Sequence, residues 1–280
     1  MNKVFQYSGN KQFIVPVINE FISKVLGNSW DKFYEPFCGS AAIFYNLDNW
    51  ENKICYLNDF DFNITLMHNC VKSHDYETYI KLVNGIKVCF GDIKADKEAY
   101  YVCRDYFNKT YYEQIKNKEF TPGGLMLIVL ANSCLNSMLR FSSNGMNQSF
   151  GNRSFTIPEE SWNDMKKRLE NTTITNLSWE DVLPNKLEDS VVFLDPPYVD
   201  RPMTYNDKFN NFDNFINKLI SLSGKNSLVF YTDIENNKSD TLLQFGFNKY
   251  VLRTMKSTSP NRKSGIEETG KEILYWKHFK

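Results

Sequence analysis

The sequence predicts an α/β protein with a doubly wound, mostly parallel sheet and a mainly helical subdomain inserted into it. Two short apolar segments, Lys32–Glu35 and Val191–Leu194, are predicted to be strands that run into turns. A strand, a turn, a helix and a second strand follow one another early in the chain, an order typical of parallel sheets. Between residues 61 and 141 the pattern is helical, which indicates the insertion.

The first α/β unit begins with the strand at Lys32–Glu35, which ends at the turn of residues 36–39. A helix is predicted from Ser40, because apolar residues recur on one face at helical spacing. The second strand is predicted at Lys53–Leu57 and ends at Asn58 and Asp59.

The insertion changes character near its end, where residues 144–154 are rich in Gly, Asn and Ser and predict a loop or a β-hairpin. After Pro158 the α/β pattern resumes, with strands predicted at Val191–Leu194, Ser227–Tyr231 and Ile273–Trp276. Residues 1–60 and 158–280 are therefore expected to form one α/β domain, and residues 61–157 the inserted subdomain.

Composition and charge leave most classes of function open. The chain has 280 residues, of which 42% are hydrophobic, and its net charge of zero gives no indication of a nucleic-acid partner. The cysteines are scattered without a Cys-x-x-Cys pair, so we expect a reduced cytosolic protein without a metal. No apolar run reaches about 18 residues, so no membrane segment is expected.

The tetrapeptide Asp195-Pro196-Pro197-Tyr198 is a candidate for chemistry because it follows a predicted strand, and ligands of open α/β sheets bind beyond the carboxyl ends of strands. Its prolines fix two φ angles and remove two donors, which leaves the Asp195 carboxylate and nearby carbonyls as rigid acceptors. Such acceptors suit an aryl amine like N6 of adenine, whose lone pair is delocalised into its ring. Tyr198 offers a ring on which a flipped base can stack. The alternative is an aspartate that caps a proline-rich turn.

A second candidate site lies at the ends of the first two predicted strands. Gly39 follows the first strand in a turn where backbone can approach a nucleotide-type ligand closely. Asp59 ends the second strand, where a carboxylate can accept hydrogen bonds from ribose hydroxyls. The alternative for Asp59 is a helix N-cap before Phe60–Met67.

In these and further motifs, the chain resembles the Dam family of DNA adenine-N6 methyltransferases, the D12 class, and especially its T-even phage branch. The resemblance runs from Tyr7 to Trp276 and keeps the order of the family's motifs. It covers residues 7–12 (the amino-terminal cofactor motif), 35–41 (F-x-G-x-G), 58–59 (the ribose-binding acid), 136–141 with 150–153 (the DNA-reading hairpin), and 195–198 with 205–209 (the catalytic loop). In the F-x-G-x-G motif Ala41 replaces the second glycine.

The resemblance implies a Rossmann-like methyltransferase fold and transfer of a methyl group from S-adenosylmethionine to N6 of adenine in double-stranded DNA, at GATC-type sites. It makes residues 1–60 and 158–280 the catalytic domain and residues 61–157 the target-recognition subdomain. The residues it assigns to catalysis are Asp195, Pro196, Pro197 and Tyr198. Those it assigns to the cofactor are Tyr7, Lys11, Glu35, Phe37, Gly39, Ser40, Asp59 and Asp195. Those it assigns to DNA are Met138, Arg140, Asn152, Arg153 and Tyr205. It implies no metal, no membrane and no obligate protein partner, and the cytoplasm of a bacterium or a phage-infected host as the location.

Other methyl transfers are distinguished by single residues. C5-cytosine methylation needs a cysteine nucleophile, usually after proline, and no proline of this chain precedes a cysteine. N4-cytosine methylation stays an alternative, although the families that perform it have Ser at the position of Asp195, and so does RNA N6-adenine methylation, where Asn is more usual. A catalytically inactive DNA-binding relative is the alternative of another class, and the intact tetrapeptide argues against it.

Overall fold

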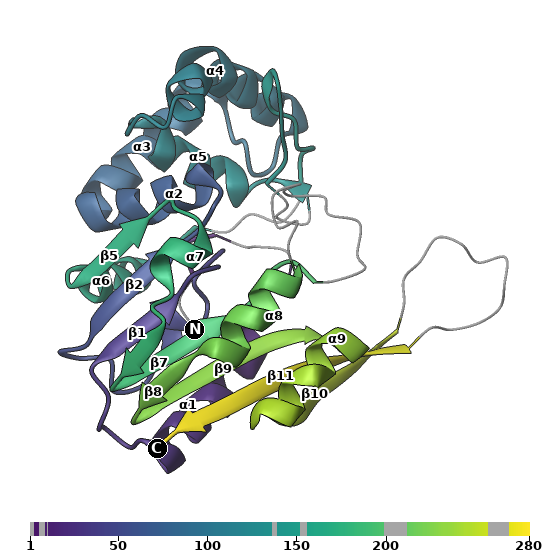
Figure 1. The fold of residues 1–280 in the computed structure, drawn as a ribbon. Helices are drawn as coiled ribbons and strands as arrows, with labels where there is room; N and C mark the ends of the chain where they lie inside the picture. Colours follow the sequence, from purple (N-terminus) through teal and green to yellow (C-terminus); the bar gives the residue numbers. More distant parts are fainter. Residues whose placement is uncertain are drawn as a thin grey trace, which may run out of the picture.

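The computed structural model describes residues 3–5, 9, 11–135, 139–151, 156–198, 212–256 and 269–280. Their architecture is a seven-stranded sheet covered by helices on both faces, with a group of helices beyond one edge of the sheet (Figure 1). The strand order is β10-β11-β9-β7-β1-β2-β5. The strands are β1 (Lys32–Glu35), β2 (Ile54–Asn58), β5 (Thr172–Thr175), β7 (Ser190–Leu194), β9 (Ser227–Ile234), β10 (Asn248–Lys256) and β11 (Thr269–Phe279).

Five neighbouring strands of this sheet, β5, β2, β1, β7 and β9, run parallel, which confirms the predicted fold class. β11 is antiparallel to both β9 and β10 and lies between them. The winding direction changes between β1 and β7, because β2 continues on one side of β1 while β7 lies on the other. In sheets of this kind, the crevice outside such a switch point is the usual ligand site.

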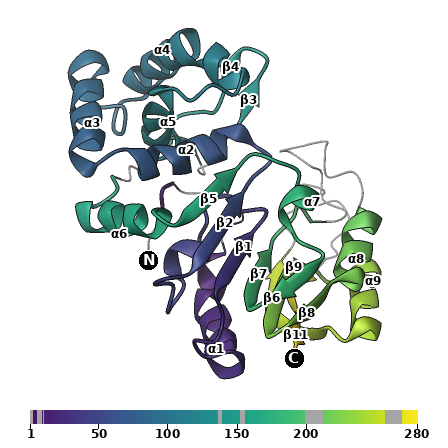
Figure 2. The ribbon, with the colours of Figure 1, turned by 60° about the vertical axis from the view of Figure 1, so that its left-hand side comes forward.

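The two faces of the sheet carry separate apolar cores, because successive side chains of a strand point to opposite faces. Val191 and Phe193 of β7 belong to the core that α1 and α6 cover, whereas Val192 and Leu194 belong to the core under α8. Figure 2 shows α1 and α6 on one side of the sheet and α7, α8 and α9 on the other. These helices are α1 (Val15–Val25), α6 (Glu159–Leu169), α7 (Trp179–Val182), α8 (Phe212–Ser221) and α9 (Asn237–Asp240).

The helical group consists of α2 (Phe62–Ser73), α3 (Tyr76–Phe90), α4 (Lys97–Lys116) and α5 (Gly123–Ala131). All residues of α5 are buried. α5 packs so closely on α2 that a Cβ at Gly124 would lie 2.4 Å from Cys70 Sγ. In the described part of the chain, no helix combines the length and apolarity needed to cross a bilayer.

The short elements complete the fold. They are the 3₁₀ turns η1 (Gln12–Ile14), η2 (Phe44–Asn46) and η4 (Thr241–Phe245), the parallel pair β6 (Lys186–Glu188) and β8 (Ser223–Lys225), and the hairpin β3 (Phe141–Ser142) and β4 (Gly145–Met146). The hairpin begins earlier than the predicted segment 144–154, so only β4 falls inside that segment. The helix predicted from Ser40 is wrong, since turns and η2 occupy that stretch.

Candidate active site

Asp195 is the first residue after β7, and its carboxylate is held from two sides. Lys11 Nζ lies 2.8 Å from Oδ2, and the Thr232 hydroxyl donates a hydrogen bond of 2.7 Å to Oδ1. Thr232 belongs to the neighbouring strand β9, and Lys11 directly precedes η1. The Asp195 side chain is still 20% exposed, so a ligand at the end of the sheet can reach it.

A second carboxylate, Glu272 of β11, lies beside this pair and was not predicted from the sequence. Its Oε1 accepts a hydrogen bond of 2.6 Å from the Tyr198 hydroxyl and lies 3.6 Å from Lys11 Nζ. Its Oε2 accepts a hydrogen bond of 2.6 Å from Arg253 Nε. Glu272 is 1% exposed. The one signal in the sequence is a glutamate directly ahead of the apolar segment Ile273–Trp276.

The cluster contains two cations, Lys11 and Arg253, and two carboxylates, Asp195 and Glu272. Burial and these charges together shift the pKa values of its members. Burial raises the pKa of Asp195, and the Lys11 ammonium partly opposes this rise. Burial alone would raise the pKa of Glu272, but the Tyr198 hydroxyl, Lys11 and Arg253 hold it below its ordinary value. Burial beside both carboxylates raises the pKa of the Tyr198 hydroxyl far above its usual range, so this hydroxyl stays a donor.

The Gly39 loop at the carboxyl end of β1 is tied to Asp59 after β2. The Gly39 amide donates to Asp59 Oδ2 and the Asp61 amide donates to Oδ1, both at 2.9 Å. The N-cap of α2 is Asp61, whose side chain accepts from the Asn63 amide at 2.9 Å. The helix-cap alternative for Asp59 is therefore wrong. Burial raises the pKa of Asp59 to about 7, although its amide donors lower it.

His68 of α2 holds the other side of Gly39, a contact that was not predicted from the sequence. His68 Nε2 lies 2.7 Å from the Gly39 carbonyl oxygen, and Nδ1 lies 2.9 Å from the Tyr45 hydroxyl. Because a carbonyl can only accept, Nε2 carries the proton and the Tyr45 hydroxyl donates to Nδ1. Burial lowers the pKa of His68 to about 4, so the ring is neutral. The helical group thereby contacts the loop directly.

Two residues of this loop have left-handed backbone, Gly39 with φ of +48° and Ala41 with φ of +52°. Glycine adopts this conformation freely, whereas a Cβ makes it strained. Ala41 stands where the family motif has its second glycine, so the chain keeps the glycine-like backbone without the glycine. Left-handed residues interrupt a helical repeat, which is why the helix predicted from Ser40 is not formed.

Glu35 ends β1, the strand between β7, which Asp195 follows, and β2, which Asp59 follows. Its Oε2 accepts from the Phe44 amide at 3.3 Å, and it is 2% exposed. Burial raises the pKa of Glu35 well above its ordinary value, and the charges of Asp195 and Asp59 add to the rise. Three adjacent strands, β2, β1 and β7, thus each place one carboxyl group at their carboxyl ends.

The residues around the Gly39 loop fit the nucleoside part of S-adenosylmethionine. The Asp59 carboxylate accepts from the backbone amides of Gly39, Asp61 and Phe60, and its remaining lone pairs suit ribose hydroxyls. Phe37 lies on the α8 side of the loop, where its ring centroid is 6.1 Å from that of Trp179 and 6.0 Å from that of Phe215. Apolar rings of this kind suit a purine. Ser40 is buried in the loop itself.

A row of polar side chains on α4 holds residues 141–148, the segment that contains the hairpin. The row consists of Tyr100, Arg104, Asn108 and Tyr112, each four residues from the next and therefore on one face of the helix. The Tyr112 hydroxyl donates to the Ser142 carbonyl at 2.6 Å. Asn108 exchanges two hydrogen bonds of 2.9 Å with the backbone of Met146. The other two members donate to the Gln148 carbonyl at 3.1 and 3.3 Å.

Gly145 allows the hairpin to lie this close to α4. Its φ is +112°, and a Cβ there would lie 2.4 Å from Asn108 Oδ1. Arg140, which is exposed, directly precedes β3. In the catalytic loop Pro196 is buried and Pro197 is exposed. Five predicted site residues lie outside the described residues: Tyr7, Met138, Asn152, Arg153 and Tyr205.

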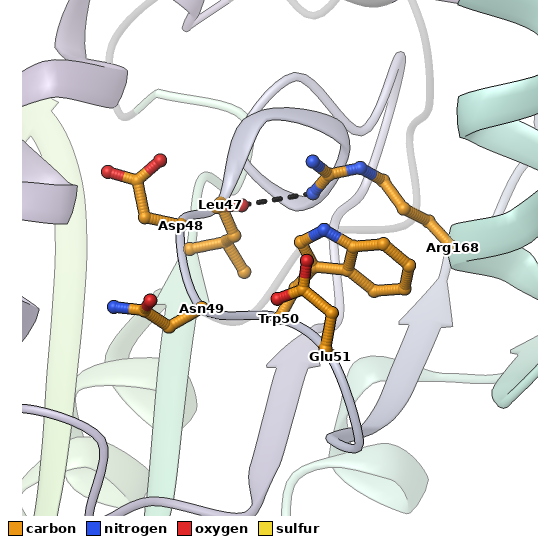
Figure 3. Close-up of a pocket in the computed structure, with 6 residues that line it drawn as sticks. All are labelled: Leu47, Asp48, Asn49, Trp50, Glu51 and Arg168. Atoms are coloured by element: carbon orange, nitrogen blue, oxygen red, sulfur yellow. Dashed lines mark hydrogen bonds between the residues drawn. The ribbon is translucent and has the colours of Figure 1, made fainter.

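A shallow hollow of about 400 Å³ lies at the opposite end of the strands, where β2 and β5 begin (Figure 3). It is lined by Leu47, Asp48, Asn49, Trp50, Glu51 and Arg168. The Arg168 guanidinium lies 4.6 Å from the Trp50 ring centroid and donates to the Leu47 carbonyl at 3.0 Å. None of the predicted site residues that the structure describes lines this hollow. Within the described ranges, no group of His, Cys, Asp and Glu side chains is arranged to hold a metal ion.

Comparison with known proteins agrees with this geometry. A family model described as D12 class N6 adenine-specific DNA methyltransferase matches residues 7–258. The chain is 28% identical to the Type II methyltransferase M.MjaIII of Methanocaldococcus jannaschii over 75% of this chain and 73% of that protein. It is 25% identical to a DNA adenine methylase of Serratia marcescens, over 73% and 70% of the two chains. It is 26% identical to the Type II methyltransferase M.CviBI of Paramecium bursaria Chlorella virus NC1A, over 71% and 69%.

Proposed function

Because the chain belongs to the D12 class of N6 adenine-specific DNA methyltransferases, we propose that it moves the methyl group of S-adenosylmethionine to N6 of adenine in double-stranded DNA. The observation that carries this proposal is the Asp195 carboxylate, fixed by Lys11 and Thr232 at the end of β7 while still open to a ligand. When bound, S-adenosylmethionine supplies a methyl group on a sulfonium sulfur, which is the electrophile.

Asp195 is proposed to act on the amine. Its oxygens each keep a lone pair for an N6 hydrogen, and accepting that hydrogen makes the nitrogen more tetrahedral, with its own lone pair available for attack. Positive charge develops on the nitrogen during attack, so a fixed carboxylate stabilises the transition state. The raised pKa of Asp195 suits it to take up the proton that the methylated amine must lose. The Tyr198 ring supplies a face for the flipped base.

The cofactor is assigned to the neighbouring site at the carboxyl ends of β1 and β2. Asp59 accepts from ribose hydroxyls, the Gly39 and Ser40 backbone approaches the ligand, and the Phe37 ring packs on it. Glu35 is assigned to the cofactor from the sequence motif, and burial raises the pKa of its carboxyl. Tyr7 is assigned to the cofactor from the sequence motif alone.

The target-recognition role is proposed for residues 61–157, with GATC-type sites as the target. The resemblance supplies Met138, Arg140, Asn152 and Arg153 as DNA contacts, and Tyr205 from the catalytic loop. An arginine can bind guanine O6 and N7 in the major groove, so we expect Arg153→Ala to relax discrimination at one guanine by about 1–3 kcal/mol. A uniform loss on all sequences would make Arg153 a phosphate contact instead.

The experiment is methylation of unmodified plasmid DNA by the purified protein with S-adenosylmethionine, followed by single-molecule sequencing. We expect N6-methyladenine at GATC-type sites with the wild-type protein. We expect none with Asp195→Ala, which removes both acceptor oxygens. Absence of N6-methyladenine after wild-type treatment, or methylation at cytosine N4, overturns the proposal. N6-methyladenine at other sequences overturns only the GATC assignment.

A further inference from the structure

Glu272 is buried at a junction of three parts of the chain. The catalytic loop reaches it through the Tyr198 hydroxyl, the amino-terminal segment through Lys11, and β10 through Arg253. The Arg253 guanidinium also lies 4.0 Å from the ring centroid of Phe13, two residues after Lys11. These donors fix the position of the buried carboxylate, and removing one of them would leave buried charge without full compensation.

The contact with Tyr198 bears on the ring that is proposed to stack on the base. A tyrosine ring that is anchored only at Cα can rotate about two side-chain bonds. The hydrogen bond of 2.6 Å from its hydroxyl to Glu272 fixes the far end of the ring as well. The hydroxyl remains a donor because its pKa is raised far above the usual range.

The contact with Lys11 bears on Asp195. The ammonium lies 2.8 Å from Asp195 and 3.6 Å from Glu272, and 4.9 Å from the Tyr198 ring centroid. One cation is therefore shared between two carboxylates. Without the charge on Glu272, the ammonium would keep Asp195 Oδ2 and the Gly9 carbonyl oxygen as its acceptors, so it should bind more tightly to Oδ2, one of the two oxygens that an entering amine uses.

We propose that Glu272 is a positioning residue for methyl transfer, which orients the Tyr198 ring through its hydroxyl and shares the Lys11 ammonium with Asp195. The inference rests on the proposed function, because it concerns the placement of the target base. It gives β11 a role at the site in addition to its place in the sheet. It also predicts an effect on the rate of the chemical step that exceeds any effect on binding.

The test compares Glu272→Gln, Tyr198→Phe, the double variant and the control Glu235→Gln. Glu235 is paired on the surface with Lys249 at 2.8 Å and Lys271 at 3.3 Å, so its variant removes a carboxylate beside the same strands but outside the site. For each protein we would measure the melting temperature, the dissociation constants of cofactor and DNA, and the single-turnover rate of methyl transfer.

We expect Glu272→Gln to lower the single-turnover rate by about tenfold to a hundredfold, as small misplacements of reacting groups do. Both dissociation constants should stay within about threefold of wild type, and Glu235→Gln should match wild type. The one amide oxygen of Glu272→Gln should keep the charged Arg253 donor, which turns the amide nitrogen toward the Tyr198 hydroxyl and deprives that hydroxyl of its acceptor. The double variant should therefore be about as slow as Glu272→Gln alone.

Three results overturn the inference: a Glu272→Gln rate equal to wild type, independent multiplication of the two single effects, or an equal loss in the surface control. If Glu272→Gln does not fold, Tyr198→Phe tests the same hydrogen bond from its other end, and an unchanged rate there overturns the orienting role. A wild-type protein that forms no N6-methyladenine would instead contradict the proposed function, so the two failures are distinguishable.

Discussion

The Lys11 ammonium and the Asp195 carboxylate form an ion pair of 2.8 Å across the end of β7. Because Thr232 donates to the other oxygen, both oxygens of Asp195 already have one donor each. An entering amine must use the second lone pairs. The same ammonium lowers the pKa of Asp195 against the effect of burial, so Lys11 helps to keep the acceptor ionised.

The first prediction concerns that ion pair. Lys11→Met keeps the length of the side chain and removes the charge, so the pKa of Asp195 should rise further. Asp195 then becomes protonated at higher pH, and the acidic limb of the pH profile for single-turnover methyl transfer should move upward. A limb at the wild-type pH would show that Lys11 does not act on Asp195. Lys271→Met, which removes a surface lysine of β11, serves as the control.

The second prediction concerns Asp59, whose pKa is raised to about 7. Accepting from ribose hydroxyls favours the ionised form, so cofactor binding near pH 7 should release a proton, and affinity should rise from pH 6 to pH 8. Asp59→Ala should lose about 1.5–3 kcal/mol of cofactor affinity and the proton release with it. Calorimetric titrations in two buffers of different ionisation enthalpy measure both. Binding without proton release would contradict the ribose role.

The third prediction concerns the left-handed backbone at Ala41. Ala41→Gly relieves strain of about 1–2 kcal/mol and adds flexibility to the unfolded chain that costs about 0.4–1 kcal/mol. The net effect should be a stabilisation of about 0–1.6 kcal/mol, with a higher melting temperature and unchanged cofactor affinity. Gly39→Ala at the neighbouring left-handed position should do the reverse, lowering both stability and cofactor affinity. A destabilised Ala41→Gly variant would refute this account.

The fourth prediction concerns the acid stability that His68 confers. Its pKa is about 4 in the folded protein and about 6.5 when unfolded, so between these values the unfolded chain binds more protons. The contribution of His68 is therefore present above pH 6.5 and lost as the pH falls toward 4, by on the order of 3 kcal/mol. His68→Gln does not titrate, so its difference from wild type in urea unfolding should shrink over that window. A constant difference would mean that His68 is not buried and neutral.

The fifth prediction concerns the row on α4 that holds the hairpin. Asn108→Ala removes two hydrogen bonds to the backbone of Met146, so the hairpin should become less ordered while the end of the sheet is untouched. We expect methylation rates on GATC and on its single-base variants to converge, with cofactor affinity unchanged. Thr110→Ala, an exposed change on the same helix, is the control. Full discrimination in Asn108→Ala would show that the hairpin does not depend on this row.

Much of the fold was predictable because buried parallel strands appear in the sequence as short apolar runs that end in turns. Val191–Leu194 differs from β7 by one residue, and Asp195 follows it as expected. The family is confirmed, and its T-even phage branch stays a prediction. The strand β10 was not predicted. It lies at the edge of the sheet, where Tyr250 and Val251 are exposed, and an edge strand shows a weaker apolar pattern than a buried one.

The partners of the site residues were not predictable from local pattern. Tyr198 and Glu272 are 74 residues apart in the chain, and Gly39 and His68 are 29 apart. The two residues of each pair are too far apart in the sequence for one local motif to contain both. The helix expected after Ser40 failed for a different reason, because the backbone at Ala41 opposes the preference of its own residue type.

The hairpin β3–β4 has two residues in each strand, too few to persist as an independent unit. α4 supplies its shape, and the groups that its polar side chains hold, at Ser142, Met146 and Gln148, are all backbone atoms. Two side chains of the segment also pack: the Phe141 ring stacks on the Tyr112 ring of α4 at 6.0 Å between centroids, and Met146 is buried. The exposed side chains of Ser143, Asn144 and Asn147 can therefore change with little loss of stability, so that new target preferences can arise on the same backbone frame. Gly145 is the exception, since any side chain there would collide with Asn108.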